Sequence, residues 1–204
     1  MSKSNHEWRD RQNRDPYIKR AAKEGWRSRA VFKLEEINNK EKILYPGMIC
    51  MDLGSAPGSW SQYTSIKLKE KVRIIALDIL PMDYLPAVEF IQGDFLEDDV
   101  FNLVIKLLDN KKIDLVMSDM APNISGIKVS DQARSIYLVE LALDIAKKTL
   151  KKKGNFICKL FQGQGSDMFI KEVRQVFEKV RVFKPNSSRP NSREVYLIAK
   201  SYLG

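Results

Sequence analysis

The chain contains little cysteine and histidine, with two Cys and one His among 204 residues. Cys50 and Cys158 are too few for a disulfide scaffold and cannot by themselves make a structural zinc site. No apolar run approaches the ~18 residues that cross a bilayer. The N-terminal residues also lack the apolar segment of a secretion signal. We therefore expect a cytoplasmic protein without a membrane segment.

Two phosphate-binding motifs are also absent. No predicted strand is followed by Gly-x-Gly-x-x-Gly, which disfavours a dinucleotide cofactor and hence a nicotinamide oxidoreductase. The glycine-containing turn after the first predicted strand has no Walker lysine, which argues against an NTPase. The sequence has no internal repeat and no low-complexity linker. At roughly 150 residues per domain, we expect one domain over residues 16–204 and a flexible basic tail over residues 1–15.

Charge is abundant and unevenly distributed, with 35 Lys and Arg against 26 Asp and Glu, a net charge of +9. Residues 1–33 carry a net charge of +6, residues 34–146 carry −7 and residues 147–204 carry +10. Basic ends around an acidic middle predict a basic surface that attracts phosphates. The lysines between positions 147 and 153 are better explained as a solvated helix end, favoured by the helix dipole.

The N-terminal basic stretch also contains aromatic residues, which favours RNA as its partner. Aromatic faces stack on unpaired bases while arginines pair with phosphates. We therefore expect an RNA-binding helical segment at about residues 16–42, in which Arg27 and Arg29 contact RNA and can be changed with little effect on a cofactor.

Seven short apolar runs fit buried strands. They are Met48–Leu53, Val72–Ile79, Val88–Gln92, Ile113–Ser118, Asn155–Phe161, Val180–Phe183 and Val195–Ala199. Helices fit at residues 28–39, 59–69, 97–109, 131–152 and 166–178. This alternation predicts an α/β fold with a mostly parallel sheet covered on both faces. The last two runs have no helix between them, so we expect them to pair antiparallel at one edge.

The informative short motifs fall where predicted strands end, which is where open α/β sheets bind ligands. Gly54 and Gly58 follow the first strand and allow a tight turn and close backbone approach to a ligand. Asp78 ends the second strand and is placed to hold two ribose hydroxyls, and Asp94 follows the third and could accept a bond from the amine of adenine. This series suits a nucleoside with a short polar tail, such as S-adenosylmethionine.

Each of these residues has a structural alternative. A strand-ending aspartate is often a helix cap or turn residue, and for Asp94 the two interpretations are about even. A further aspartate, Asp119, follows the fourth strand, and an ordered series of this kind is hard to explain by caps alone. Trp60 either contacts the ligand or packs in the core. Lys159 either is buried for chemistry or extends to solvent at the end of its strand.

Five ordered segments carry the most specific signal. They are Ser28–Ile37, Asp52–Gln62, Met117–Asn123, Lys159–Gly163 and Ser192–Tyr196. Over residues 15–199 the chain resembles the FtsJ family of RNA 2′-O-methyltransferases, and within it the bacterial branch that acts on a uridine ribose of large-subunit ribosomal RNA. The resemblance implies a Rossmann-like class I S-adenosylmethionine-dependent methyltransferase fold with a seven-stranded sheet, and the large (50S) ribosomal subunit as partner.

The resemblance also implies roles for individual residues. The family's catalytic set falls on Lys33, Asp119, Lys159 and Glu194. Its S-adenosylmethionine contacts fall on Gly58, Trp60, Asp78, Asp94 and Asp119. A ribose hydroxyl must be oriented and lose its proton, so we hypothesise that Lys159 is the general base or the orienting group. Lys33 is then a neighbouring like charge, Asp119 the counter-charge and Glu194 a positioning group, and no metal is required.

Other functions remain open at this point. A methyltransferase for small molecules or proteins would use the same cofactor site but needs no basic termini and no lysine pair. The protein is alternatively a tRNA 2′-O-methyltransferase or a non-catalytic RNA-binding ribosome assembly factor. For the rRNA enzyme we expect a monomer that acts on the assembled 50S particle.

Overall fold

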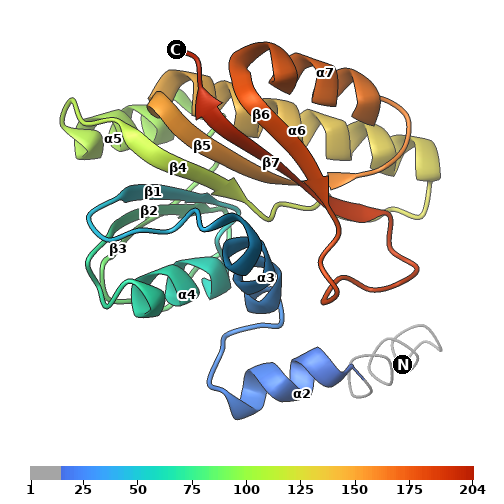
Figure 1. Ribbon diagram of the computed structural model, residues 1–204, viewed down its shortest axis with the longest axis horizontal. Coiled ribbons are helices and arrows are strands. Elements are labelled where there is room, and N and C mark those ends of the chain that lie inside the picture. The colour runs from blue at the N-terminus through green and yellow to red at the C-terminus, as the bar shows by residue number, and fades with distance from the viewer. Residues whose placement is uncertain (1–14) are drawn as a thin grey trace.

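The computed structural model describes residues 15–204, in which strands and helices alternate along most of the chain (Figure 1). Apart from Asp15, the expected basic tail lies outside the described residues. The first described helix is α2 (Pro16–Lys23), and its N-cap is Asp15, whose side chain accepts a hydrogen bond from Tyr17 N at 3.0 Å. This N-cap explains why the helix begins there.

The seven strands form one sheet in the order β3-β2-β1-β4-β5-β7-β6. They are β1 Ile49–Leu53, β2 Arg73–Asp78, β3 Val88–Gln92, β4 Ile113–Ser118, β5 Leu150–Phe161, β6 Phe177–Phe183 and β7 Glu194–Tyr202. The pairs from β3 through β5 are parallel, whereas β7 pairs antiparallel with β5 and with the edge strand β6. The predicted mostly parallel seven-stranded sheet is therefore confirmed, as is the antiparallel pairing of its last two strands.

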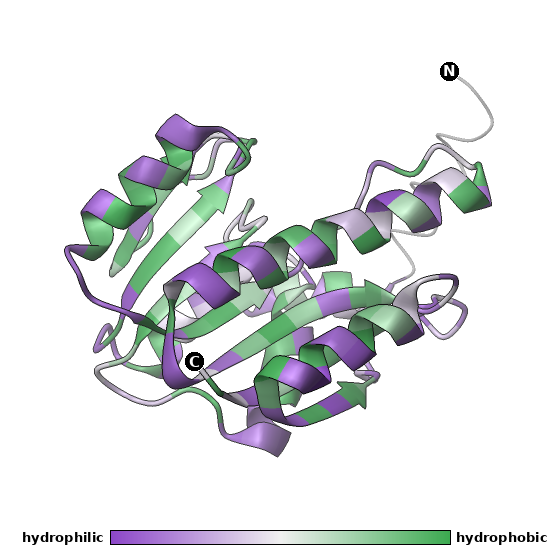
Figure 2. Ribbon diagram, turned by 90° about the horizontal axis from the view of Figure 1, so that it is seen from above, coloured by the Kyte–Doolittle hydropathy of each residue, from purple (hydrophilic) through white to green (hydrophobic). Residues whose placement is uncertain are grey.

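Helices cover both faces of this sheet (Figure 1). They are α3 Val31–Glu41, α4 Ser59–Lys67, α5 Asp98–Leu108, α6 Lys128–Thr149 and α7 Ser166–Val176. Side chains of α3 and α4, such as Phe32 and Tyr63, pack on one face of the strands, and those of α5, α6 and α7, such as Leu143, pack on the other. Figure 2 shows hydrophobic residues along the central strands and hydrophilic residues recurring along the helices, as expected for this layering.

The boundary between α6 and β5 differs from the prediction. A helix was expected to residue 152, but α6 ends at Thr149 and the lysine run after Leu150 belongs to β5. Leu150 is buried and pairs with Ile113 of β4, and the Lys151 ammonium forms an ion pair with Asp114. Burial of Leu150 and strand pairing therefore override the helical tendency of the lysines.

A similar difference occurs where α7 meets β6. The helix was expected to continue to residue 178, but β6 already starts at Phe177. Phe177 is buried against Phe156 and Tyr202, with ring centroids 6.2 and 5.3 Å away. This aromatic packing is formed across the sheet, so it leaves no local pattern in the sequence.

The parallel arrangement determines where a site can lie. Strands β1 to β4 end at the same edge of the sheet. Asp78 ends β2, and Gly58, Asp94 and Asp119 lie in the loops that follow β1, β3 and β4. Among residues 15–204, no helix is both long enough and apolar enough to span a bilayer.

Candidate functional site

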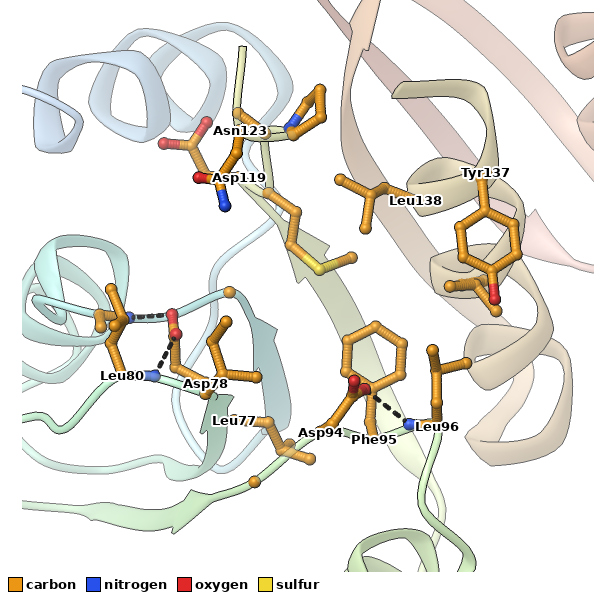
Figure 3. A pocket seen from close by; sticks show the side chains of 18 residues that line it. Leu77, Asp78, Leu80, Asp94, Phe95, Leu96, Asp119, Asn123, Tyr137 and Leu138 are labelled. Atoms are coloured by element: carbon orange, nitrogen blue, oxygen red, sulfur yellow. Dashed lines mark hydrogen bonds between the residues drawn. The ribbon is translucent and has the colours of Figure 1, made fainter. Parts of the chain in front are cut away.

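A cavity of about 420 Å³ lies at the carboxyl ends of β1 to β4. Its walls are formed by the loops after these strands and by part of α6, including Tyr137 and Leu138 (Figure 3). The structure brings Asp78, Asp94 and Asp119 together on this cavity, each from the end of a different strand. Its volume falls within the range of small-molecule sites.

Asp78 and Asp94 also stabilise turns. Asp78 accepts hydrogen bonds from Ala56 N at 2.8 Å and Leu80 N at 2.9 Å, and Asp94 accepts one from Leu96 N at 3.0 Å (Figure 3). Both aspartates therefore do have the turn-stabilising role that the sequence offered as an alternative to ligand binding. A carboxylate has about four acceptor positions, so both groups keep capacity for a ligand in the cavity that they line.

The two glycines of the turn after β1 lie in different places. Gly54 lines the cavity with a φ of 71°, and a Cβ there would collide with the Met120 side chain. Gly58 is the N-cap of α4, and its missing Cβ instead leaves room for the Arg27 guanidinium. We expected the backbone to approach a ligand closely at both glycines, but only Gly54 lines the cavity. Gly54 was not among the residues assigned to the cofactor, whereas Gly58 was.

Trp60, an expected cofactor contact, lies in the core. Its side chain is buried, its Nε1 donates to Ala30 O at 2.9 Å, and its ring centroid is 5.6 Å from that of Tyr196. It lines only a separate, small cavity of about 30 Å³ next to Gly54 and Asp119. These surroundings fit the alternative that Trp60 packs in the core.

The four residues of the expected catalytic set meet beside the large cavity. They are Lys33 on α3, Asp119 after β4, Lys159 on β5 and Glu194 on β7. Lys159 Nζ lies 2.7 Å from Asp119 O and 2.9 Å from Asp119 Oδ1, and Lys33 Nζ lies 2.9 and 3.0 Å from the two oxygens of Glu194. The cross distances are 3.9 Å for Lys33–Asp119 and 4.0 Å for Lys159–Glu194. We call these four side chains the charged cluster.

Two cations and two anions balance each other in the charged cluster, which suits its burial. Burial alone would raise the pKa of the Asp119 carboxyl. The Lys159 and Lys33 ammonium groups and the Tyr196 hydroxyl outweigh that effect and hold the pKa below its usual value. Asp119 is therefore an anion at neutral pH and provides a fixed negative charge between the two lysines.

Two further residues support the charged cluster and were not predicted. The Tyr196 hydroxyl donates to Asp119 Oδ1 at 2.5 Å, and Ser188 Oγ donates to Glu194 Oε1 at 2.8 Å. Tyr196 follows Glu194 by two positions on β7, so the period of a strand places both side chains on one face, which is a signal that could have found it. Ser188 lies in the loop before β7, where the sequence offers no such periodicity.

Arg27, expected on the RNA surface, is bound to the loops beside the large cavity. Its Nη1 donates to Pro57 O and Asp83 O and its Nη2 to Tyr84 O, each at 2.9 Å. These carbonyls belong to the loops after β1 and β2. The expectation that Arg27 can be changed without affecting a cofactor site therefore does not fit its contacts.

Comparisons with known proteins show which family the chain resembles. Residues 26–202 match the family described as FtsJ-like methyltransferase. The "Ribosomal RNA large subunit methyltransferase E" of Stutzerimonas stutzeri is 55% identical over 203 residues, covering 100% of this chain and 98% of that protein. The protein of the same name from Marinobacter nauticus is 53% identical over 201 residues, with 98% and 97% covered.

Solved structures give the same result. A ribosomal RNA methyltransferase from Plasmodium falciparum superposes with a TM-score of 0.79 at 33% identity, covering 88% of this chain and 100% of that one. A fibrillarin/Nop5p complex gives a TM-score of 0.58 at 14% identity, with 86% and 85% covered, which shows the fold alone. The predicted class I methyltransferase fold is thus confirmed, and the chain belongs to the FtsJ-like methyltransferase family.

Proposed function

We propose that the protein transfers a methyl group from S-adenosylmethionine to the 2′-hydroxyl of a uridine ribose in large-subunit ribosomal RNA. It acts as a monomer in the cytoplasm, on the assembled large subunit. The observation that carries the proposal is the charged cluster next to a cavity of nucleoside size. The substrate class follows the names of the full-length relatives.

The large cavity fits S-adenosylmethionine by the chemistry of its walls. Asp78 and Asp94 offer acceptors for ribose hydroxyls and for an exocyclic amine, and Phe95 and Met120 offer apolar surface for a base. Gly54 keeps the wall open where a Cβ would close it. When bound there, S-adenosylmethionine supplies an electrophilic methyl group.

Lys159 is positioned to take the proton from the ribose hydroxyl. Lys159 acts as a base only after its ammonium has released a proton to solvent. The neutral amine then has two N–H groups and one lone pair, and Asp119 offers two acceptors, O and Oδ1, at 2.7 and 2.9 Å from Nζ. The lone pair is then free to accept the 2′-hydroxyl proton. With S-adenosylmethionine bound, the ribose oxygen would form its bond to the methyl carbon as the carbon–sulfur bond breaks, leaving S-adenosylhomocysteine. The ammonium that results lies in contact with the Asp119 carboxylate. Proton transfer to a positioned base contributes about 10²–10⁴ in rate.

Lys33 and Glu194 hold this arrangement in place. Glu194 binds the Lys33 ammonium through both oxygens and is itself fixed by Ser188. Lys33 therefore stands 3.9 Å from Asp119 as a second cation, and Glu194 balances it. We assign Glu194 a positioning role, because Lys33 occupies both of its carboxylate oxygens.

The experiment that tests the function compares three acceptors for methyl transfer from labelled S-adenosylmethionine. They are unmodified large ribosomal subunits, protein-free ribosomal RNA and bulk tRNA, and each product is mapped for ribose methylation. We expect label at a 2′-oxygen of the subunit RNA. Label on tRNA would keep the chemistry but overturn the substrate. No label on any RNA, despite tight binding of S-adenosylmethionine, would overturn RNA as the acceptor.

A further inference from the structure

Two more cavities lie next to each other beside the charged cluster. The first, about 310 Å³, contains Lys33 and Glu194 and is also lined by Arg29 and Arg189; we call it the acceptor cavity. The second, about 290 Å³, is lined by residues that include Lys128, Gln132, Asn191 and Arg193; we call it the side cavity. The two share Ile124 and Phe161 in their linings, so these two residues form the ridge between them.

Ile124 forms the top of this ridge and is 78% exposed. Its loop, between β4 and α6, is held by Asp131, whose carboxylate accepts from Ser125 N at 2.8 Å, Ser125 Oγ at 2.7 Å and Gly126 N at 3.1 Å. The backbone next to Ile124 is therefore fixed although the side chain has little packing of its own. Ile124 is thus an exposed apolar side chain on a fixed backbone between two cavities, and it is placed to contact an apolar face of a ligand that occupies both.

The charges of the two cavities favour an anionic ligand. The side cavity contains the cations Lys128 and Arg193, and neither has a carboxylate of residues 15–204 within 4.0 Å. Asp131 is the acidic residue of that cavity, and its oxygens are occupied by the loop. In the acceptor cavity Arg29 pairs with Asp15, while Arg189 is more exposed and lies 3.8 Å from the same carboxylate. Phosphates of one nucleic-acid strand running over the ridge would meet cations on both sides.

We propose that Ile124 is a wedge that separates two adjacent nucleotides of the RNA, with the target nucleotide in the acceptor cavity and its neighbour in the side cavity. This inference rests on the proposed function, because it needs an RNA acceptor. A base stacked on its neighbour holds the ribose within the strand, whereas attack requires the 2′-oxygen to face Lys159. Unstacking one step costs a few kcal/mol, which an inserted apolar side chain and new phosphate contacts offset.

The chain offers a matched control for this wedge. Ile127 lies in the same loop and is 66% exposed, but it lines neither cavity. Ile124→Ala and Ile127→Ala remove the same atoms from two exposed positions three residues apart. Neither side chain is packed in the core, so both variants are expected to fold, which thermal unfolding verifies.

The test uses a synthetic RNA hairpin that contains the mapped target, with 2-aminopurine placed on its 5′ or its 3′ side. Wild-type protein should raise the fluorescence of one of the two RNAs, because an unstacked 2-aminopurine emits more strongly. Ile124→Ala should abolish that rise and lower kcat/KM for methyl transfer to large subunits about tenfold. Its Kd for S-adenosylmethionine should change less than twofold, and Ile127→Ala should match the wild type throughout.

Two results would overturn the wedge while leaving the proposed function intact. One is binding of both labelled RNAs by the wild type without a rise in fluorescence. The other is equal kcat/KM for Ile124→Ala and Ile127→Ala on intact large subunits. Failure of the wild type to methylate any RNA is a different outcome, since it removes the proposed function and the wedge with it.

Discussion

The nitrogen of Lys159 contacts Asp119 twice, and this geometry predicts the effect of replacing the lysine. Lys159→Ala should lower kcat at least about 10²-fold, because the ribose hydroxyl loses its proton acceptor. Affinity for S-adenosylmethionine should change little, since Lys159 does not line the large cavity. Single-turnover methyl transfer and calorimetry with S-adenosylmethionine measure the two quantities separately.

Lys159→Arg is the informative companion variant. Arginine keeps a positive charge beside Asp119 but does not give up its proton at neutral pH. If Lys159 acts as the base, this variant should be as inactive as Lys159→Ala. Wild-type activity in Lys159→Arg would contradict the base role and leave only an electrostatic one.

Asp52 gives a second prediction on the scale of a single residue. It is buried beneath the loop after β1 and accepts a hydrogen bond from Ser61 Oγ at 2.7 Å. Burial raises its pKa to about 7 against the pull of that hydrogen bond, and the charges of Asp119 and Asp78 add to the rise. In an unfolded chain the value is about 3.9.

The folded state therefore binds this proton more tightly than the unfolded state. The corresponding stabilisation is fully present below about pH 4 and is lost as the pH rises through about 7. Asp52→Asn has no such proton, so its free energy of unfolding should rise relative to wild type between these pH values, by on the order of a few kcal/mol. Urea unfolding of both proteins across this range measures the difference, and a difference that does not vary with pH would contradict the assignment.

On the scale of structural elements, the link between α2 and α3 is tied to both loops that border the large cavity. Arg27 in this link bonds to three carbonyls of those loops, and Ser28 Oγ lies 2.7 Å from Ser59 Oγ at the start of α4. Arg27→Gln should therefore raise the Kd for S-adenosylmethionine about tenfold, since hydrogen bonds to charged groups contribute about 1.5–3 kcal/mol. Calorimetry measures this Kd.

A control for Arg27 lies on the opposite edge of the sheet. Arg181 on β6 is exposed and pairs with Glu41, far along the sheet from the cofactor loops. Arg181→Gln changes the same charge and should leave the Kd for S-adenosylmethionine as it is. If Arg27→Gln instead lost RNA binding alone, the original expectation of an RNA contact would be correct.

The elements show which parts of the structure the sequence can predict. Runs such as Ile74–Leu77 are strand-like at every position, so the strands, the mostly parallel sheet and the strand-end aspartates Asp78 and Asp94 follow from local pattern and topology. The start of β5 at Leu150 could not be predicted from the local pattern, because it depends on pairing with β4. The contacts of Arg27 likewise join segments 30 or more residues apart, for which no local pattern exists.

The charged cluster was predicted by a different route. Lys33 and Glu194 are 161 positions apart, and only the family resemblance connected them before the structure did. Physical reasoning from the sequence could place Lys159 in an apolar strand but could not decide between burial and solvation. The Asp119 contacts of its nitrogen supply the missing information.

On the scale of the whole molecule, the net charge of +9 predicts a strong effect of salt on RNA binding. Each phosphate contact releases counterions, so the RNA affinity should fall linearly with salt on a double-logarithmic plot between about 50 and 200 mM. Lys128→Gln, which removes one cation of the side cavity, should reduce the slope by about 0.7. Filter binding measures the slope, and an unchanged slope would remove Lys128 from the RNA contact surface.

Asp119 is shared by the large cavity and the charged cluster, since it lines the cavity and also contacts Lys159. In the proposed transfer Lys159 gains a positive charge beside Asp119, and a methyl donor bound in the cavity that Asp119 lines would lose one. The total charge of the buried region is then the same before and after the reaction. Surrounding dipoles that are aligned for the reactants remain aligned for the products, so little reorganisation is needed. Return of the proton from Lys159 to water becomes a separate event that completes each turnover.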